Sequence, residues 1–312
     1  MNYDRLENDN QNLNTYWDIA IGLQKVDDLE PSNYLYELKD KNISNVLSND
    51  QIEDLLYEKY KDETKDEIEQ RKKECDIVSN RMVKILSSKG SFRLIPENFA
   101  LFHGLLFKDI FEQLEEKYVG KFRDFNISKK EPILNGKSVI YSDYNEIKST
   151  LEYDMHTERE IDYNLLYQHE VIDKITNFTS RIWQVHPFIE GNTRTTAIFI
   201  QKHLNQIGFN INNDMFSQYA KYFRNALVRA NYYNRSLNVD PNEVYLKKFF
   251  VNLLYNGNYE LSNKDLIVKE CFYEESVDEM KTKSIINSVI DNSIEDNKKN
   301  NSIEGNEDDG RK

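Results

Sequence analysis

The sequence contains few of the residues that break or cross-link a chain. Its 312 residues include ten glycines and five prolines, so it lacks the frequent turn residues that punctuate all-β folds. Its two cysteines, Cys75 and Cys271, are far apart and show no metal-ligand spacing. This scarcity argues against a disulfide scaffold and against a zinc site, and it suits a reducing compartment.

Positive charge and long apolar runs are also scarce. The chain carries 41 basic against 54 acidic side chains, a net charge of -13 at pH 7. Long-range attraction to nucleic-acid phosphates or anionic membranes is therefore not expected as a main function. No apolar run approaches the roughly 18 residues of a membrane span, and the N-terminus is polar and acidic, unlike a signal peptide. We expect a cytoplasmic protein whose partners are a protein or a small molecule.

Helical periodicity occupies most of the chain. Apolar residues recur at three- and four-residue spacing, as in the stretch 49–60, so we predict a mainly α fold. The segment 122–144 differs, because β-branched and aromatic residues there flank Asn135-Gly136, a strong signal for a β-hairpin. From about residue 287 the chain is dominated by Asn, Asp, Glu, Lys and Ser, which is typical of disorder.

The stretch HPFIEGNTRT, residues 186–195, lies between two helical patterns and gathers several reactive residue types. Gly191 and Asn192 can turn the backbone and point amides outward at the start of the second helix, where the helix dipole favours a phosphate. Arg194 adds a planar charged fork that can grip phosphate oxygens. The loop is therefore a candidate anion-binding site.

Two further residues in this loop suggest phosphorus-group transfer. Glu190 places a negative charge in a loop that would bind an anion, and a divalent ion between this carboxylate and the phosphate oxygens would explain it. Mg²⁺ is commonly held by one or two carboxylates plus phosphates. His186 precedes Pro187, which disfavours continuing the helix and helps to present the imidazole. An imidazole can take a proton from an attacking hydroxyl group. Each residue alone has an ordinary structural explanation, but together they supply what transfer from a nucleotide needs.

The stretch HPFIEGNTRT resembles the signature of the Fic family, His-Pro-Phe-x-(Asp/Glu)-Gly-Asn-Gly-Arg-x-x-Arg. LFHGLLFKDIF followed by VGKFRDFNI resembles the helix and turn before the family's β-hairpin flap, and YFRNALVRANYY resembles a later helix. The similarity covers roughly residues 95–256. It implies a helical fold with one hairpin and, most often, transfer of AMP from ATP to a hydroxyl group of a protein.

The resemblance assigns roles to individual residues. His186 would deprotonate the target hydroxyl, and Glu190 would hold Mg²⁺, or Mn²⁺, against the phosphates of ATP. The flap around Val139, Ile140 and Tyr141 would hold the target segment by backbone pairing. The residues assigned to the nucleotide are Glu190, Gly191, Asn192, Thr193, Arg194 and Thr195 in the loop, and Tyr222 and Asn231 in an adenine pocket.

Two positions depart from the family signature. Thr193 replaces the second glycine, a change that still leaves a backbone amide. Ala197 replaces the second arginine, which in the family pairs with an inhibitory glutamate or contacts the γ-phosphate. No clean copy of the inhibitory motif is found: in residues 20–32 Asp27 would stand for the glutamate, and residues 300–306 contain Glu304 without the preceding serine. We therefore expect weak or absent inhibition, and self-modification.

These features suggest three regions: an N-terminal helical region over residues 1–94, resembling a small antitoxin module, a Fic core over residues 95–257, and a C-terminal extension over residues 258–312. Two alternatives stay open. The same fold could transfer another group, such as phosphate or phosphocholine, although Thr193 stands where kinase relatives carry a lysine in this loop. The chain could also be an interaction module without catalysis. A homodimer is compatible with either reading.

Overall fold

The computed structural model describes residues 3–61, 66–90, 92–111, 116–211 and 215–268, with only the backbone described for residues 3–11. Met1–Val268 form one compact unit. Within the described ranges the chain is mainly helical, which confirms the predicted fold class. The segments expected to be disordered or to carry Glu304 lie outside the described residues.

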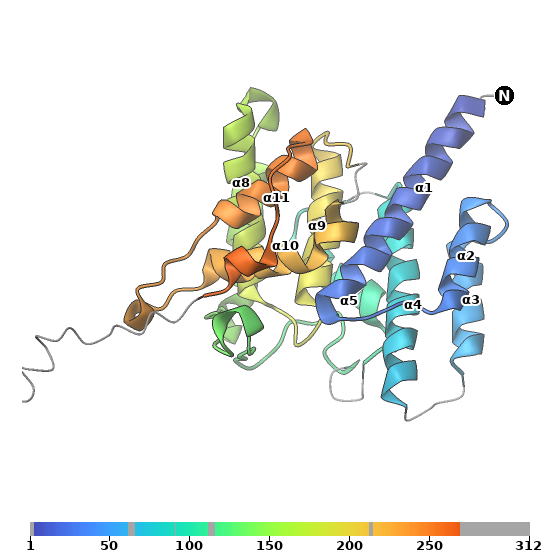
Figure 1. Cartoon of the computed structure of the whole chain (residues 1–312), viewed down its shortest axis with the longest axis horizontal. Coiled ribbons are helices and arrows are strands. Elements are labelled where there is room, and N and C mark those ends of the chain that lie inside the picture. The colour runs from blue at the N-terminus through green and yellow to red at the C-terminus, as the bar shows by residue number, and fades with distance from the viewer. Residues whose placement is uncertain (1–2, 62–65, 91, 112–115, 212–214, 269–312) are drawn as a thin grey trace, which may run out of the picture. The chain divides into compact units, whose positions relative to one another are not determined.

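The N-terminal part consists of four α-helices and one short 3-10 helix (Figure 1). They are α1 (Tyr3–Gln24), η1 (Lys25–Asp27), α2 (Asn33–Ile43), α3 (Asn49–Lys59) and α4 (Glu67–Ser87). At the start of α3 the Ser48 hydroxyl accepts from the Gln51 amide while the Gln51 side chain accepts from the Ser48 amide, a reciprocal capping box. The helix predicted over residues 49–60 is therefore confirmed.

The remaining helices of the described residues lie between residues 96 and 266. They are α5 (Pro96–Phe107), η2 (Pro132–Leu134), η3 (Tyr144–Glu146), α7 (Ile147–Arg159), η4 (Tyr163–Leu165), α8 (Gln168–Val185), α9 (Asn192–Gln206), α10 (Met215–Asn231), η5 (Arg235–Leu237), α11 (Val244–Tyr255) and η6 (Asn263–Leu266). α9 contacts α4, α5 and α8, while α1 lies against both α4 and α10. Every residue from Asn192 to Gln201, at the start of α9, is buried. The polar start of this helix is thus placed inside the core.

The predicted β-hairpin is not formed. Asn135 and Gly136 both have positive φ, 52° and 79°, and they reverse the chain as expected. The Glu131 amide donates to the Lys137 carbonyl at 2.9 Å, but no strand lies between residues 116 and 147, a range that is fully described. Pro132 offers a physical reason, since it has no amide hydrogen to donate to a ladder and favours the short helix η2. We call residues 126–143 the covering loop.

None of the helices in the described part of the chain combines the length and the apolar character that crossing a bilayer requires.

Gly22 allows the closest approach of α1 to α10. A Cβ atom on Gly22 would lie 2.2 Å from the Ser217 Cα and 2.9 Å from its carbonyl oxygen, so backbone would have to move. We expect Gly22→Ala to lower the free energy of unfolding by about 1–3 kcal/mol, the usual cost of overpacking, as measured by urea titration. Gly90→Ala is the matched control, because a Cβ there meets nothing within 4 Å. Equal urea midpoints for the two variants would show that the contact is not tight.

Candidate active site

His186 ends helix α8 in a conformation that few residues other than glycine adopt. Its φ and ψ are 48° and 58°, and its amide donates to the Trp183 carbonyl at 3.0 Å. A left-handed conformation costs a non-glycine residue roughly 1–2 kcal/mol, and Pro187 follows directly. The backbone here must therefore be held by its surroundings.

Arg123 supplies that hold. Its guanidinium is buried and donates from Nε to the His186 carbonyl at 2.9 Å and from Nη2 to the Val185 carbonyl at 3.2 Å. It also donates to the carbonyls of Ser142 at 2.6 Å and Phe125 at 2.7 Å. The first two carbonyls belong to the C-terminal end of α8, where the helix dipole is negative and favours a cation. One side chain thus fixes the end of α8 against the last part of the covering loop and against the residue that precedes the loop.

The imidazole of His186 is buried beneath the covering loop. The Tyr141 ring stacks on it with centroids 4.0 Å apart and an interplanar angle of 21°, and Trp183 meets it edge-on. Burial lowers the pKa of His186 well below its ordinary value, and the nearby cation Lys129 lowers it further. Its Nδ1 has no hydrogen-bond partner among the described residues. The ring is therefore neutral near pH 7 and has an unused nitrogen.

Asn192 braces the loop that follows His186. Its side-chain amide donates to the Phe188 carbonyl at 2.7 Å, and its side-chain oxygen accepts from the Phe188 amide at 3.0 Å. Both polar atoms are thus engaged within the loop. Any ligand contact from Asn192 in this conformation would come from its backbone amide.

His103, from α5, supports the same loop from the other side. Its ring stacks on Phe188 with centroids 3.9 Å apart. Nδ1 accepts from the Gly120 amide at 2.9 Å, so Nε2 donates to the Glu190 carbonyl at 3.1 Å. Burial lowers the pKa of His103 to about 3, which keeps the ring neutral and preserves this donor and acceptor pattern. No pattern in the sequence distinguished His103 as a site residue.

Gly191 is required where α9 begins. Its φ is 75°, and a Cβ atom would lie 2.4 Å from the Phe107 ring. Thr193 and Thr195, which follow it, are engaged inside the protein. Thr193 Oγ1 accepts from Trp183 Nε1 at 2.9 Å, and Thr195 Oγ1 donates to the Gly191 carbonyl at 2.9 Å. Thr193 therefore fixes the indole that borders His186.

Two basic side chains that the sequence analysis missed also lie at the site. Lys129, on the covering loop, forms an ion pair with Glu190. Arg224, on α10, pairs through Nη1 with Glu131 at 2.7 Å, and Glu131 is buried. Lys129 lies within the segment predicted as a hairpin, whereas nothing in the local pattern distinguishes Arg224.

A small cavity joins five of the predicted residues. Its volume is about 50 Å³, room for one or two water molecules at ~30 Å³ each. Its walls bring together His186, Glu190, Gly191, Asn192 and Thr193 with Asp27, Lys129, Glu131, Trp183 and Arg224. A nucleotide is larger than this cavity.

Arg194 does not line this cavity. Nε forms an ion pair with Asp27 at 2.8 Å, Nη2 one with Glu74 at 2.7 Å, and Nη1 donates to the Gln24 side chain at 3.0 Å. Its guanidinium lies 4.8 Å from the centre of the Phe107 ring. Burial alone would lower the pKa of Arg194, but Asp27 and Glu74 outweigh burial and raise it. The residue considered for inhibition, Asp27, thus contacts Arg194, and Glu74 contacts it as well.

The two residues assigned to an adenine pocket lie apart from the cavity at His186. Tyr222 is buried, and its hydroxyl donates to the Tyr245 carbonyl at 3.2 Å. The Asn231 side chain donates to the Leu227 carbonyl at 2.9 Å and to the Ser180 carbonyl at 3.3 Å. Their role toward a nucleotide stays a prediction.

The three predicted flap residues lie on the covering loop in different settings. Val139 is buried, Tyr141 stacks on His186, and Ile140 is 73% exposed. The Ile140 carbonyl accepts from the Gln184 side chain at 3.2 Å. The loop thus reaches from the imidazole to the surface, although it is not a strand.

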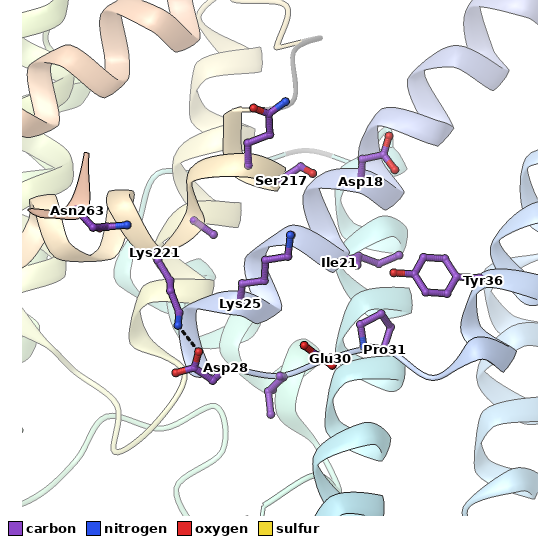
Figure 2. Close-up of a pocket in the computed structure, with 14 residues that line it drawn as sticks. Asp18, Ile21, Lys25, Asp28, Glu30, Pro31, Tyr36, Ser217, Lys221 and Asn263 are labelled. Atoms are coloured by element: carbon purple, nitrogen blue, oxygen red, sulfur yellow. Dashed lines mark ion pairs between the residues drawn. The ribbon is translucent and has the colours of Figure 1, made fainter. Parts of the chain in front are cut away.

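A larger cavity of about 660 Å³ lies between α1, η1 and α10 (Figure 2). Its walls include Lys25, Tyr36 and the ion pair between Asp28 and Lys221. It shares no lining residue with the cavity at His186. The reactive groups, rather than the volume, therefore identify the candidate site.

Residues 94–204 match the family model described as the Fic/DOC family. The match spans Arg123, the covering loop and the loop from His186 to Arg194. It excludes Asp27, Glu74 and Arg224. No curated protein matches the chain.

The hold of Arg123 on the end of α8 can be tested by substitution. We expect Arg123→Lys to lower the free energy of unfolding by about 2–4 kcal/mol, because an ammonium cannot reach all of the carbonyls and each buried one left unpaired costs roughly 1–3 kcal/mol. Urea titration measures this loss. Arg93→Lys, at an exposed position, is the control. An unchanged urea midpoint for Arg123→Lys would mean that other groups fix His186.

Proposed function

Because the chain belongs to the Fic/DOC family through residues 94–204, we propose that it transfers AMP from ATP to a Tyr, Thr or Ser hydroxyl group of a protein. The observation that carries this proposal is the neutral, buried imidazole of His186 beside the first amides of α9. A base and an anion-binding helix terminus in one cavity are what transfer of a phosphorus group to a hydroxyl requires.

His186 would act on the attacking hydroxyl group. A neutral imidazole can accept a proton, and its Nδ1 makes no competing hydrogen bond among the described residues. The proton of the target hydroxyl would pass to the ring as the oxygen attacks the α-phosphorus atom of ATP and pyrophosphate leaves. The carbonyl bond to Arg123 would keep the backbone of His186 in place during this step.

The start of α9 would receive the phosphates. The backbone amides near Gly191, Asn192 and Thr193 lie at the positive end of the helix dipole. The side chains of Asn192 and Thr193 are occupied within the protein, so the binding groups here are backbone amides. Fixed amides need no reorganisation as charge develops in the transition state.

Glu190 fits the role of a metal ligand. Its side chain is 47% exposed, lines the cavity and is already paired with the ammonium group of Lys129, so a cation is favoured beside it. No group of three or more His, Cys, Asp or Glu side chains in the described ranges forms a metal site. One carboxylate is nevertheless enough when phosphate oxygens complete the coordination. Mg²⁺ or Mn²⁺, when bound, would neutralise phosphate charge.

The covering loop would present the target. Ile140 is exposed and Tyr141 touches His186, so a target segment lying along these residues would bring its hydroxyl to the imidazole. Tyr222 and Asn231 would border the adenine ring once the loop has opened. Self-modification of an exposed hydroxyl of this chain, in the cytoplasm, fits the same scheme.

The first test separates the reaction classes. We expect label from [α-³²P]ATP, but not from [γ-³²P]ATP, to be retained on protein, and mass spectrometry to show added AMP. His186→Ala should reduce the rate by roughly a hundredfold or more, the usual contribution of a general base, while ATP binding persists. His156→Ala, at an exposed position, is the control. Retained γ label would indicate a kinase, and no label a binding module.

The second test concerns the metal. We expect Glu190→Ala and EDTA each to suppress AMP incorporation, and the variant in EDTA to be no slower than either change alone, because both remove the same contact. Glu160→Ala, at an exposed position, is the control. Full activity of the wild type in EDTA would contradict the assignment of Glu190 as a ligand.

A further inference from the structure

We infer that Arg224 and Lys129, rather than Arg194, supply the side-chain positive charge that binds the anionic part of the ligand at the candidate active site. The identity of that anion, the phosphates of a nucleotide, rests on the proposed function. The assignment of the charges rests on where the three side chains lie and on what already holds them.

The guanidinium of Arg194 is held by side chains of the N-terminal helices. Nη1 donates to the Gln24 side chain and Nη2 to Glu74, while Nε lies 2.8 Å from an Asp27 carboxylate oxygen as an ion pair without a hydrogen bond. Its side chain is 3% exposed and does not line the cavity at His186. A buried arginine that leaves such partners would leave two carboxylates close to each other without a counter-charge.

The partners of Arg194 are themselves fixed by contacts that do not involve it. Arg71 donates to the carbonyls of Asp27 at 3.0 Å and Asp28 at 2.7 Å. The Asp28 side chain forms an ion pair with Lys221 on α10, which Figure 2 shows beside Lys25. Together with the close approach of α1 to α10, these contacts anchor η1. Arg194 is therefore a tie between α9 and the N-terminal helices.

Arg224 and Lys129 are placed differently. Both line the cavity together with His186 and Gly191, and their side chains are 24% and 29% exposed. Arg224 has one ion-pair partner among the described residues, Glu131, which it contacts through Nη1. A guanidinium carries five N–H donors in a fixed fork, so further donors can face a phosphate without breaking this pair.

The two side chains would act at different stages. Arg224 lies on helix α10 and is held by the buried Glu131, so its charge is present before a ligand arrives. Lys129 lies on the covering loop, and its present partner Glu190 is the proposed metal ligand. If Glu190 took up a cation, the ammonium group of Lys129 would be free to pair with phosphate oxygens. Position 197, which departs from the family signature, holds a fully buried alanine and contributes no charge.

The experiment measures binding of ATP and of inorganic tripolyphosphate by isothermal titration calorimetry on the full chain, with melting temperature as a check of folding. We expect Arg224→Gln and Lys129→Gln each to raise the Kd of both probes by roughly tenfold to a hundredfold, the effect of losing a charge-assisted hydrogen bond. Arg235→Gln and Lys264→Gln, both exposed and outside the cavity, are the matched controls. If Arg224→Gln fails to fold because Glu131 is left unpaired, Arg224→Gln with Glu131→Gln removes both charges.

A second set of variants removes the charged partners of Arg194. We expect Asp27→Asn and Glu74→Gln to lower the melting temperature without tightening either probe. A tenfold gain in affinity from these variants would identify Arg194 as the anion-binding group and overturn the inference. So would Kd values for Arg224→Gln and Lys129→Gln equal to those of the controls, or a wild type that binds neither probe. Absence of AMP incorporation with this binding pattern intact would instead reject only the proposed function.

Discussion

The carbonyl groups at the end of α8 and on both sides of the covering loop converge on the buried guanidinium of Arg123. A helix end inside a protein needs donors for its last carbonyls, and here one cation supplies several of them. That arrangement stabilises the left-handed backbone of His186 and sets where the imidazole lies. The position of His186 and the path of the loop above it therefore depend on one buried side chain.

The polar residues at the start of α9 are buried in the core, so they too need hydrogen-bond or ion-pair partners. Its side chains find partners within the protein: Asn192 on Phe188, Thr193 on Trp183 and Arg194 on the N-terminal helices. What this leaves for a ligand is backbone amide and helix dipole. The loop can thus be rigid before a ligand binds, and rigid donors are the ones that contribute most to catalysis.

Local patterns in the sequence predicted the features that depend on neighbouring residues. The mainly helical fold, the turn at Asn135-Gly136 and the loop from His186 follow from periodicity and from residues with special backbone freedom. The hairpin prediction failed because Pro132 competes with strand pairing, a conflict between two local signals. Arg224 and Glu74 could not be found this way, and Asp27 was considered only through the family resemblance, since Asp27 and Glu74 are distant in the chain from Arg194 and meet it only through tertiary packing.

The contacts of Arg194 with the N-terminal helices affect which part of the chain could fold as an isolated fragment. The family match begins at residue 94, yet the counter-charges of Arg194 lie before that residue. Helices α1 and α4 also precede residue 94, and they contact α10 and α9 respectively. A fragment limited to the matched residues would lack these counter-charges and would expose the surface of α9 that α4 covers. The residues that the family model matches are therefore fewer than the residues that pack together in this unit, which include the N-terminal helices.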